Sequence, residues 1–256
     1  MNELPVVLTF SGLDPTGGAG LQADIETIAA LGGMALPIMT TNTIQNTQTF
    51  LESQGVDPAW LRRQARLLLQ DITPDAIKIG LAPSAETIET IADLIPEDTP
   101  VVLDPILRSG TGRNLANDEH ILAMKERLFP KCTIITPNRY EARTLGGKEV
   151  LDEAANQLIE NGCRFVLITG ADEADDRIEN HLYGINGLIE VYLHEHLPGI
   201  FHGSGCTLSS AIALLLAKGL NLRTAVEQAL AYTEVALRSG HALGKKQNHP
   251  RRVKTQ

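Results

Sequence analysis

Residues 202–207 read His-Gly-Ser-Gly-Cys-Thr and lead into an apolar helical run. The first amide groups of a helix have no partner inside it, and the helix dipole makes that end partly positive. Gly203 and Gly205 lack Cβ atoms, so an anion can approach the backbone closely there. The stretch therefore predicts an anion hole that stabilises charge developing on a phosphoryl group, unless it is only a tight turn with a helix cap.

The Cys206 thiol lies in the middle of this stretch. The positive end of a helix favours thiolate, so the position predicts a lowered pKa and a side chain able to act as a general base. Phosphoryl transfer depends mostly on positioning and charge stabilisation, and the thiol could equally serve only to orient a substrate. The sequence leaves both roles open.

A second glycine-rich stretch, Gly12–Asp24, links a predicted strand to a predicted helix. It lacks the Gly-Lys-Ser/Thr of a Walker A loop, and Ala23 stands where a dinucleotide fingerprint would have its third glycine. Its glycines still let the backbone wrap closely round a small ligand. Asp24 falls in the first turns of the helix, where it either complements the helix dipole or accepts hydrogen bonds from substrate N–H groups.

Polar residues follow three further predicted strands. Gln45 lies among the hydroxyl and amide side chains of Thr41–Thr47, a composition that suits a neutral polar ligand or an ordinary polar loop. Asp104 follows an apolar strand and is able to hold Mg²⁺ through water. Asn138 and Glu141 fit a capping box at a helix start, and Glu141 is also a candidate second carboxylate for magnesium and phosphate oxygens.

Short runs of β-branched residues alternate with helical patterns along the chain. The strands and helices that they predict must position the candidate residues. Strands that are apolar on both faces and alternate with helices predict a mostly parallel sheet covered on both sides. Asn186-Gly187 lies between two apolar runs and predicts an antiparallel hairpin at the sheet edge. The expected strands are Val6–Phe10, Leu36–Thr40, Ala76–Ile79, Pro100–Leu103, Thr133–Thr136 and Phe165–Thr169, with hairpin strands His181–Ile185 and Leu188–Leu193 and closing helices over 207–218 and 222–239.

The net charge of −9 argues against binding to nucleic acid or to an anionic membrane. No run approaches the roughly 20 apolar residues of a membrane span, and the N-terminus lacks the pattern of a signal peptide. The three cysteines are far apart and show no disulfide or zinc spacing. These features predict one cytoplasmic domain, residues 1–256, with a solvated basic end at 251–254 and mobile segments at 108–117 and 172–179.

Together these motifs resemble the ribokinase-like superfamily, and within it the hydroxymethylpyrimidine and phosphomethylpyrimidine kinases of thiamine biosynthesis. The resemblance covers nearly the whole chain and rests most on Gly12–Asp24 and residues 202–207, with Cys206 where most ribokinase relatives carry aspartate. It implies a three-layer α/β/α sandwich, transfer of the γ-phosphoryl group of ATP to a substituted pyrimidine, a magnesium ion and a homodimer. The residues whose roles it implies are Gly12, Asp24, Gln45 and Leu81 for the pyrimidine, Asn138, Glu141, Thr169 and Ser204 for ATP, Asp104 and Glu141 for magnesium, and Gly203, Gly205 and Cys206 for the anion hole and catalysis.

The chain departs from that pattern on the nucleotide side. Such kinases usually carry Lys-Gly-Gly-His after the sixth strand, with the lysine near the ATP phosphates, whereas this chain has Thr169-Gly170. Arg108 or Arg113 is a candidate replacement for the missing cation.

Three alternatives remain at this point. The first is a pyridoxal or pyridoxine kinase of vitamin B6 salvage, from the same superfamily. The second is a non-catalytic pyrimidine-binding regulatory protein, which the missing lysine suggests. The third, a hydrolase with Cys206 as nucleophile, is less favoured because His202 is only four residues away and poorly placed as its base.

Overall fold

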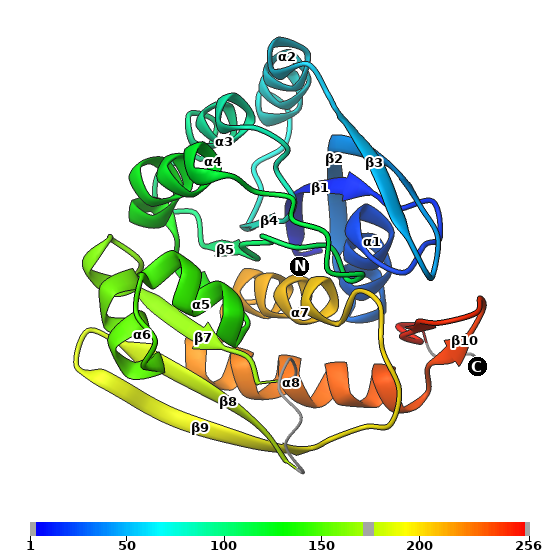
Figure 1. Cartoon of the computed structure of the whole chain (residues 1–256). Helices are drawn as coiled ribbons and strands as arrows, with labels where there is room; N and C mark the ends of the chain where they lie inside the picture. Colours follow the sequence, from blue (N-terminus) through cyan, green and yellow to red (C-terminus); the bar gives the residue numbers. More distant parts are fainter. Residues whose placement is uncertain (1–3, 171–176, 254–256) are drawn as a thin grey trace.

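A computed structural model describes residues 4–170 and 177–253, and within them nine strands form one sheet in the order β3-β2-β1-β4-β5-β6-β7-β8-β9 (Figure 1). The central strands from β2 to β7 pair in parallel, and antiparallel strands close the sheet at both edges. The strands are β1 (Val6–Leu13), β2 (Met34–Gln45), β3 (Phe50–Gly55), β4 (Ala76–Ile79), β5 (Val101–Leu103), β6 (Ile134–Ile135), β7 (Phe165–Ile168), β8 (Arg177–Gly184) and β9 (Gly187–Glu195).

Helices occupy the connections between the strands, as the periodicity predicts. Two of them begin at side-chain caps, where Asp57 and Ser84 accept hydrogen bonds from backbone amides three residues later. The helices are α1 (Gly20–Ala30), α2 (Pro58–Leu69), α3 (Ala85–Ala92), α4 (Asp118–Ala123), α5 (Arg139–Gly146), α6 (Leu151–Glu160), α7 (Ser204–Ala217) and α8 (Leu222–Arg238), with a π-helical turn (Met124–Leu128) and a 3₁₀ turn (Phe129–Lys131) after α4.

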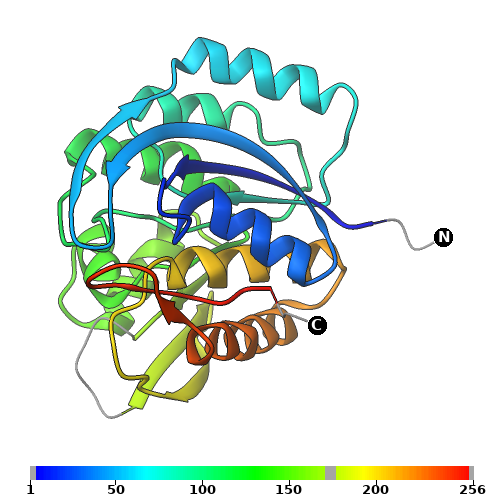
Figure 2. The ribbon, with the colours of Figure 1, turned by 90° about the vertical axis from the view of Figure 1, so that its right-hand side faces the viewer.

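Alternate residues of the central strands pack on opposite faces of the sheet. Leu8 and Leu103 belong to a buried cluster with residues of α2 to α6, whereas Val7 and Val102 belong to a second cluster with α1, α7 and α8. Figure 2 shows these two groups of helices on either side of the sheet. The predicted three-layer α/β/α sandwich with a mostly parallel sheet is confirmed, because side chains that alternate along a strand supply apolar surface to both layers.

The second predicted strand is longer than expected. Thr41–Gln45, expected as a polar loop after the strand, instead continue β2 and pair with β3 in an antiparallel hairpin that the sequence analysis missed. The Asn46 side chain accepts hydrogen bonds from the amides of Gln48 and Thr49 and so closes the turn. The polar side chains of this segment therefore project from a rigid strand and not from a loop.

The hairpin at the other edge is confirmed. Its strands β8 and β9 are joined at Ile185-Asn186 and are longer than predicted, so Arg177–Glu179 form part of β8 and not of a loop. The rest of the segment expected to be mobile, 172–176, lies outside the described residues. At 108–117 an isolated bridge pairs Arg108 with Asn114, and mobility there stays a prediction.

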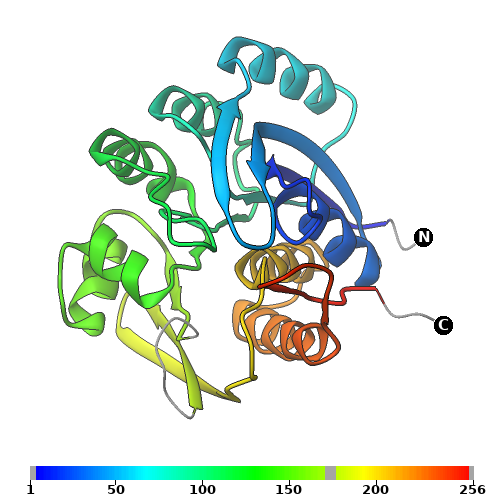
Figure 3. The same ribbon diagram turned by 45° about the vertical axis from the view of Figure 1, so that its right-hand side comes forward.

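The C-terminal segment corrects another expectation. After α8 the chain forms a short antiparallel pair, β10 (His241–Ala242) with β11 (Asn248–His249), and passes beside the start of α7 (Figure 3). Arg252 is only 3% exposed, so the prediction of a solvated basic end at 251–254 is wrong at that residue. In the described parts of the chain, no helix combines the length and hydropathy that crossing a bilayer demands.

Candidate active site

Two cavities meet at the N-terminus of α7. The glycine-loop cavity, of about 490 Å³, lies between the Gly12–Gly20 connection, the end of β2 and α7. The hairpin cavity, of about 460 Å³, lies between the β8–β9 hairpin and α8. Both are lined by Thr169, Ile200, Phe201, Ser204 and Gly205. The predicted anion hole is therefore shared by two spaces, each large enough for a small ligand.

Most of the predicted site residues come together in the glycine-loop cavity. They reach it from the carboxyl ends of β1, β2, β4 and β5 and from the starts of α5 and α7, the edge at which open α/β sheets bind ligands. The predicted residues that line it are Gly12, Gln45, Leu81, Asp104, Asn138, Glu141, Thr169, Gly203, Ser204, Gly205 and Cys206.

Asp24 lies elsewhere, behind the cavity wall that the described residues form. Its carboxylate forms an ion pair of 2.9 Å with Lys78, and both side chains are fully buried. It also accepts hydrogen bonds from Ser11 at 2.5 Å and from Ser210 at 2.7 Å. In this structure Asp24 thus serves neither of the predicted roles, since it compensates a buried cation and joins α1 to β4 and α7.

Lys78 is the buried cation that the sequence did not single out as functional. Burial disfavours its charge, but Asp24 and other nearby acidic groups outweigh that effect and raise the pKa of Lys78. Its ammonium also donates to Ser11, which lines the glycine-loop cavity. A fixed positive charge therefore lies behind the predicted anion hole.

Cys206 contradicts the expectation of a lowered pKa. Burial raises the pKa of the thiol to about 12, because the negative charges of Asp104 and Asp24 add to the desolvation of the thiolate and outweigh the charge of Lys78. The thiol lies close to the carboxylate of Asp104, whose own pKa burial raises to about 6 despite the nearby charge of Lys78. Near neutral pH the thiol is protonated and the carboxylate is mostly ionised, which favours an orienting role for Cys206 over that of a general base.

Asn138 and Glu141 form the predicted capping box. The Asn138 side chain accepts from the Glu141 amide at 2.8 Å, and one Glu141 carboxylate oxygen accepts from the Asn138 amide at 3.0 Å. The other oxygen accepts from the Leu107 amide at 3.2 Å. The capping interpretation is therefore correct, and the same contacts hold the Glu141 carboxylate at the cavity wall.

The hairpin cavity has a different lining. Aliphatic side chains from the hairpin, the segment after it, α7 and α8 contribute to it, and an ion pair of 2.8 Å between His194 and Glu234 lies beside them. Its aliphatic residues are Ile178, Leu197, Ile200, Leu208, Leu230 and Leu237. A flat apolar group fits such a space, and its polar end would reach the start of α7.

The phosphomethylpyrimidine kinase family profile matches residues 14–251. The hydroxymethylpyrimidine/phosphomethylpyrimidine kinase of Streptomyces coelicolor is 38% identical over 94% of this chain and 91% of its own length. The chain belongs to the phosphomethylpyrimidine kinase family.

The chain is also similar to part of a longer protein and to a solved structure. The thiamine biosynthesis bifunctional protein ThiED of Geobacter sulfurreducens is 37% identical over 93% of this chain, which spans only half of that protein's length. A solved structure of Staphylococcus aureus pyridoxal kinase in complex with AMP-PCP and pyridoxal superposes with a TM-score of 0.89, at 26% identity, over 98% of this chain and 94% of that one.

The chain carries threonine and not lysine at position 169, and arginines lie near this position. Arg108 lines the glycine-loop cavity, where its guanidinium stacks 3.5 Å from the Tyr140 ring centre, so its proposed role in replacing the lysine stays a prediction. Arg113 donates to the Leu51 carbonyl and lies outside both cavities as the described residues form them, which argues against it. Arg139, which the sequence did not single out, is largely buried, and its guanidinium lies beside Gly170.

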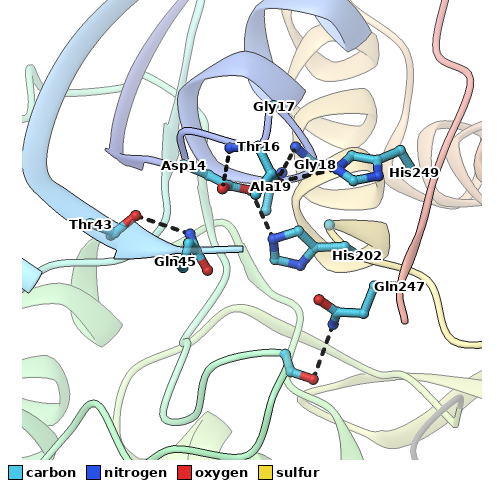
Figure 4. A network of polar contacts seen from close by, with 12 residues as sticks. Asp14, Thr16, Gly17, Gly18, Ala19, Thr43, Gln45, His202, Gln247 and His249 are labelled. Atoms are coloured by element: carbon cyan, nitrogen blue, oxygen red, sulfur yellow. Dashed lines mark hydrogen bonds and ion pairs between the residues drawn. The ribbon is translucent and has the colours of Figure 1, made fainter. Parts of the chain in front are cut away.

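Asp14 and His202 form a pair that the sequence analysis also missed. The two side chains lie 2.8 Å apart and both line the glycine-loop cavity (Figure 4). Asp14 also accepts from the amides of Thr16 and Ala19. His202 thus pairs with a carboxylate, and within the described residues its ring makes no hydrogen bond with Cys206, which argues against Cys206 as the nucleophile of a hydrolase.

The pairing of Asp14 gives a prediction on pH and stability. Burial alone would raise the pKa of Asp14, but the close approach of the His202 ring and the hydrogen bonds from Thr16 hold it below the ordinary value. The stabilisation by Asp14 is then present above the unfolded pKa of about 3.9 and is lost as pH falls through the folded value.

We expect Asp14→Asn to lower the free energy of unfolding at pH 7 by about 1–3 kcal/mol in urea titrations. The deficit should shrink below about pH 4, and a deficit that did not change with pH would contradict this account. The exposed Asp71→Asn is the control.

The buried thiol gives a second prediction. Thiolate absorbs near 240 nm, so the difference in absorbance between the wild type and Cys206→Ser follows Cys206 alone. Because burial raises the pKa to about 12, we expect the difference to stay flat from about pH 6 to 10. A rise centred near pH 7 would mean that the helix end outweighs burial and that Cys206 is available as a base.

Proposed function

We propose that this chain phosphorylates hydroxymethylpyrimidine and its monophosphate with ATP, as a step of thiamine biosynthesis. The observation that carries the proposal is the meeting of two cavities at Ser204 and Gly205, the positive end of α7. A kinase of two small substrates must bring an acceptor oxygen and a γ-phosphorus together at one anion-stabilising point. The names of relatives that are 34–38% identical over most of the chain support the same substrates.

The glycine-loop cavity suits an aminopyrimidine. Gln45 donates through Nε2 to Thr43 at 3.0 Å, so its Oε1 is the atom that would accept from an exocyclic amino group. Leu81 supplies an apolar surface for the ring face, where the family usually carries methionine. A Cβ at Gly12 would lie 2.9 Å from the Thr41 methyl group, so only glycine lets the two strands approach this closely beside the ligand.

The carboxylates Asp104 and Glu141 fit a magnesium ion bound together with the ATP phosphates. Magnesium prefers oxygen ligands and commonly takes one or two carboxylates plus substrate phosphates. The described residues contain no group of three metal-ligating side chains, so the substrate would complete the set. When bound, the ion would neutralise charge on the transferring phosphoryl group.

The protein's own groups supply the remaining chemistry of transfer. The amides at the start of α7 would stabilise the equatorial oxygens of the phosphoryl group, with Lys78 adding positive charge from behind. The Cys206 thiol would orient the acceptor oxygen next to Asp104. The hairpin cavity would hold adenine and ribose, and Thr169 and Asn138 would contact the phosphates near the bridge that joins them.

The proposal includes a single kinase domain, a homodimer and a cytoplasmic location. The three cysteines are free and buried, which suits a reducing compartment. Exposed Ile44 and Leu51 on the β2–β3 hairpin offer apolar surface of the kind that subunit interfaces cover.

The proposal is tested by ADP release with Mg-ATP and three acceptors in parallel: hydroxymethylpyrimidine, its monophosphate and pyridoxal. We expect turnover of both pyrimidines with little on pyridoxal, because Gln45 presents an acceptor to an amino group that pyridoxal lacks. Turnover of pyridoxal alone would move the assignment to vitamin B6 salvage. Tight pyrimidine binding without any turnover would identify a binding protein that has lost its nucleotide chemistry.

The assignment of substrates to cavities is tested by filling each cavity in turn. Leu197→Trp should raise the KM for ATP by at least about tenfold and leave the KM for the pyrimidine nearly unchanged, because Leu197 lines only the hairpin cavity. Leu81→Trp, in the glycine-loop cavity, should do the reverse. The opposite pattern, or equal effects on both KM values, would contradict the assignment.

A further inference from the structure

Arg252 is a buried cation at the end of the C-terminal segment, outside the residues assigned to either cavity. Its guanidinium contacts the glycine-rich connection between β1 and α1, where it donates to the carbonyl oxygens of Gly17, at 3.4 Å, and Gly18. It contacts the first turn of α7 as well, since its Nε donates to the Thr207 hydroxyl at 2.9 Å. One side chain thus bridges the two glycine-rich stretches of the molecule.

The contact with Thr207 continues to the start of the helix. The Thr207 hydroxyl, which accepts from Arg252, donates in turn to the Gly203 carbonyl oxygen at 2.8 Å. Gly203 is the N-cap of α7 and has a left-handed φ of 77°. The chain of hydrogen bonds from Arg252 therefore ends at the residue that sets the direction of the first amides of α7.

The two glycine-rich stretches touch directly at this point. A Cβ at Gly203 would collide with the Gly18 carbonyl oxygen and would lie 2.9 Å from Arg252 Nη2. A Cβ at Gly18 would collide with His202 and lie 2.8 Å from His249. Two backbones at such close range bring carbonyl dipoles together, and a buried guanidinium with several donors in a fixed plane satisfies them.

The charge of Arg252 is balanced locally. Its Nη1 lies 3.2 Å from the Glu26 carboxylate, which is about one-third exposed. The guanidinium is paired with a carboxylate on one side and donates to carbonyl oxygens on the other. Breaking any of these contacts would leave a buried polar group without a partner, so the geometry is held firmly. Asp14 with His202 joins the same two stretches, and Thr16 with His249 joins the first of them to the C-terminal segment (Figure 4).

We propose that Arg252 is a positioning residue for phosphoryl transfer, because it fixes the distance between the stretch that holds the acceptor and the helix start that holds the transferring group. This inference rests on the proposed function. Proximity of this kind acts on the chemical step, and a displacement of about 1 Å can cost on the order of 100-fold in rate. Arg252 therefore affects kcat through Gly18 and Gly203 while touching neither substrate.

The test compares Arg252→Ala with two controls. Arg251→Ala removes a neighbouring arginine whose side chain is exposed. Tyr232→Phe removes a hydroxyl that donates to the Arg252 carbonyl at 2.8 Å, so it loosens the same segment without touching either glycine-rich stretch. We expect Arg252→Ala to lower kcat at least about tenfold with little change in either KM, and the controls to keep kcat. Millimolar guanidinium should restore part of the lost kcat in Arg252→Ala alone, since the ion fits the space left by the side chain.

Hydrogen exchange provides a readout that does not depend on turnover. In Arg252→Ala the amides of residues 14–20 and 203–207 should exchange faster, and guanidinium should slow them again, whereas Tyr232→Phe should leave both stretches protected. Unchanged kcat and unchanged exchange in a folded Arg252→Ala would overturn the proposal. So would an equal kcat loss in Tyr232→Phe, which would indicate a general anchor. If the wild type turned over none of the acceptors, the proposed function would fail, and exchange in the two stretches would still decide the role of Arg252.

Discussion

Lys78 on β4 and Asp24 on α1 form an ion pair whose two side chains are fully buried. Removing one partner of such a pair leaves an uncompensated charge in the interior, at a cost of about 3–5 kcal/mol. Ser11 and Ser210 complete the contacts of the pair, so that β1, β4, α1 and α7 are joined at one point. The glycine-rich stretch runs between two of these elements, and the anion hole begins a third. The positions of both therefore depend on this pair, which also sets the charge behind Cys206 and Asp104.

The sequence predicted the parallel sheet, the edge hairpin and most of the cavity, because these follow from local patterns. Alternating helices and apolar strands determine the layers, and Asn186-Gly187 determines the turn. The prediction of a lowered pKa for Cys206 was wrong because a helix end and burial act on the same thiol, and only the fold shows that burial is the larger effect. Asp24 was assigned to the ligand because the position of Lys78, brought close by pairing between strands, is not visible from spacing.

At the start of α5, the same two side chains fit both a helix cap and a ligand-binding role. Asn138 and Glu141 were weighed as a helix cap or as ligands, and the structure shows that they form the cap at the cavity wall. A cap orients the carboxylate through backbone amides, which is also what a preorganised ligand requires. In contrast, β3 was missed because it pairs with the polar end of β2. The burial of Arg252 was missed because its partners in the two glycine-rich stretches are distant in the sequence. Basic residues near a chain end usually lie in solvent, and tertiary contacts reversed that tendency here.

The shared wall of the two cavities has a consequence for inhibitor design. Thr169, Ser204 and Gly205 border both spaces, so under the proposed function the two substrates would meet at these residues. A single molecule that joins an aminopyrimidine to an adenosine through a short polyphosphate tether would occupy both cavities at once. Its second half would bind at the effective concentration set by the tether, which short linkers raise to the millimolar range. Selectivity of such a bisubstrate compound would come from the pyrimidine end, where Gln45 and Leu81 shape the space, and the phosphates would contribute affinity at the helix end.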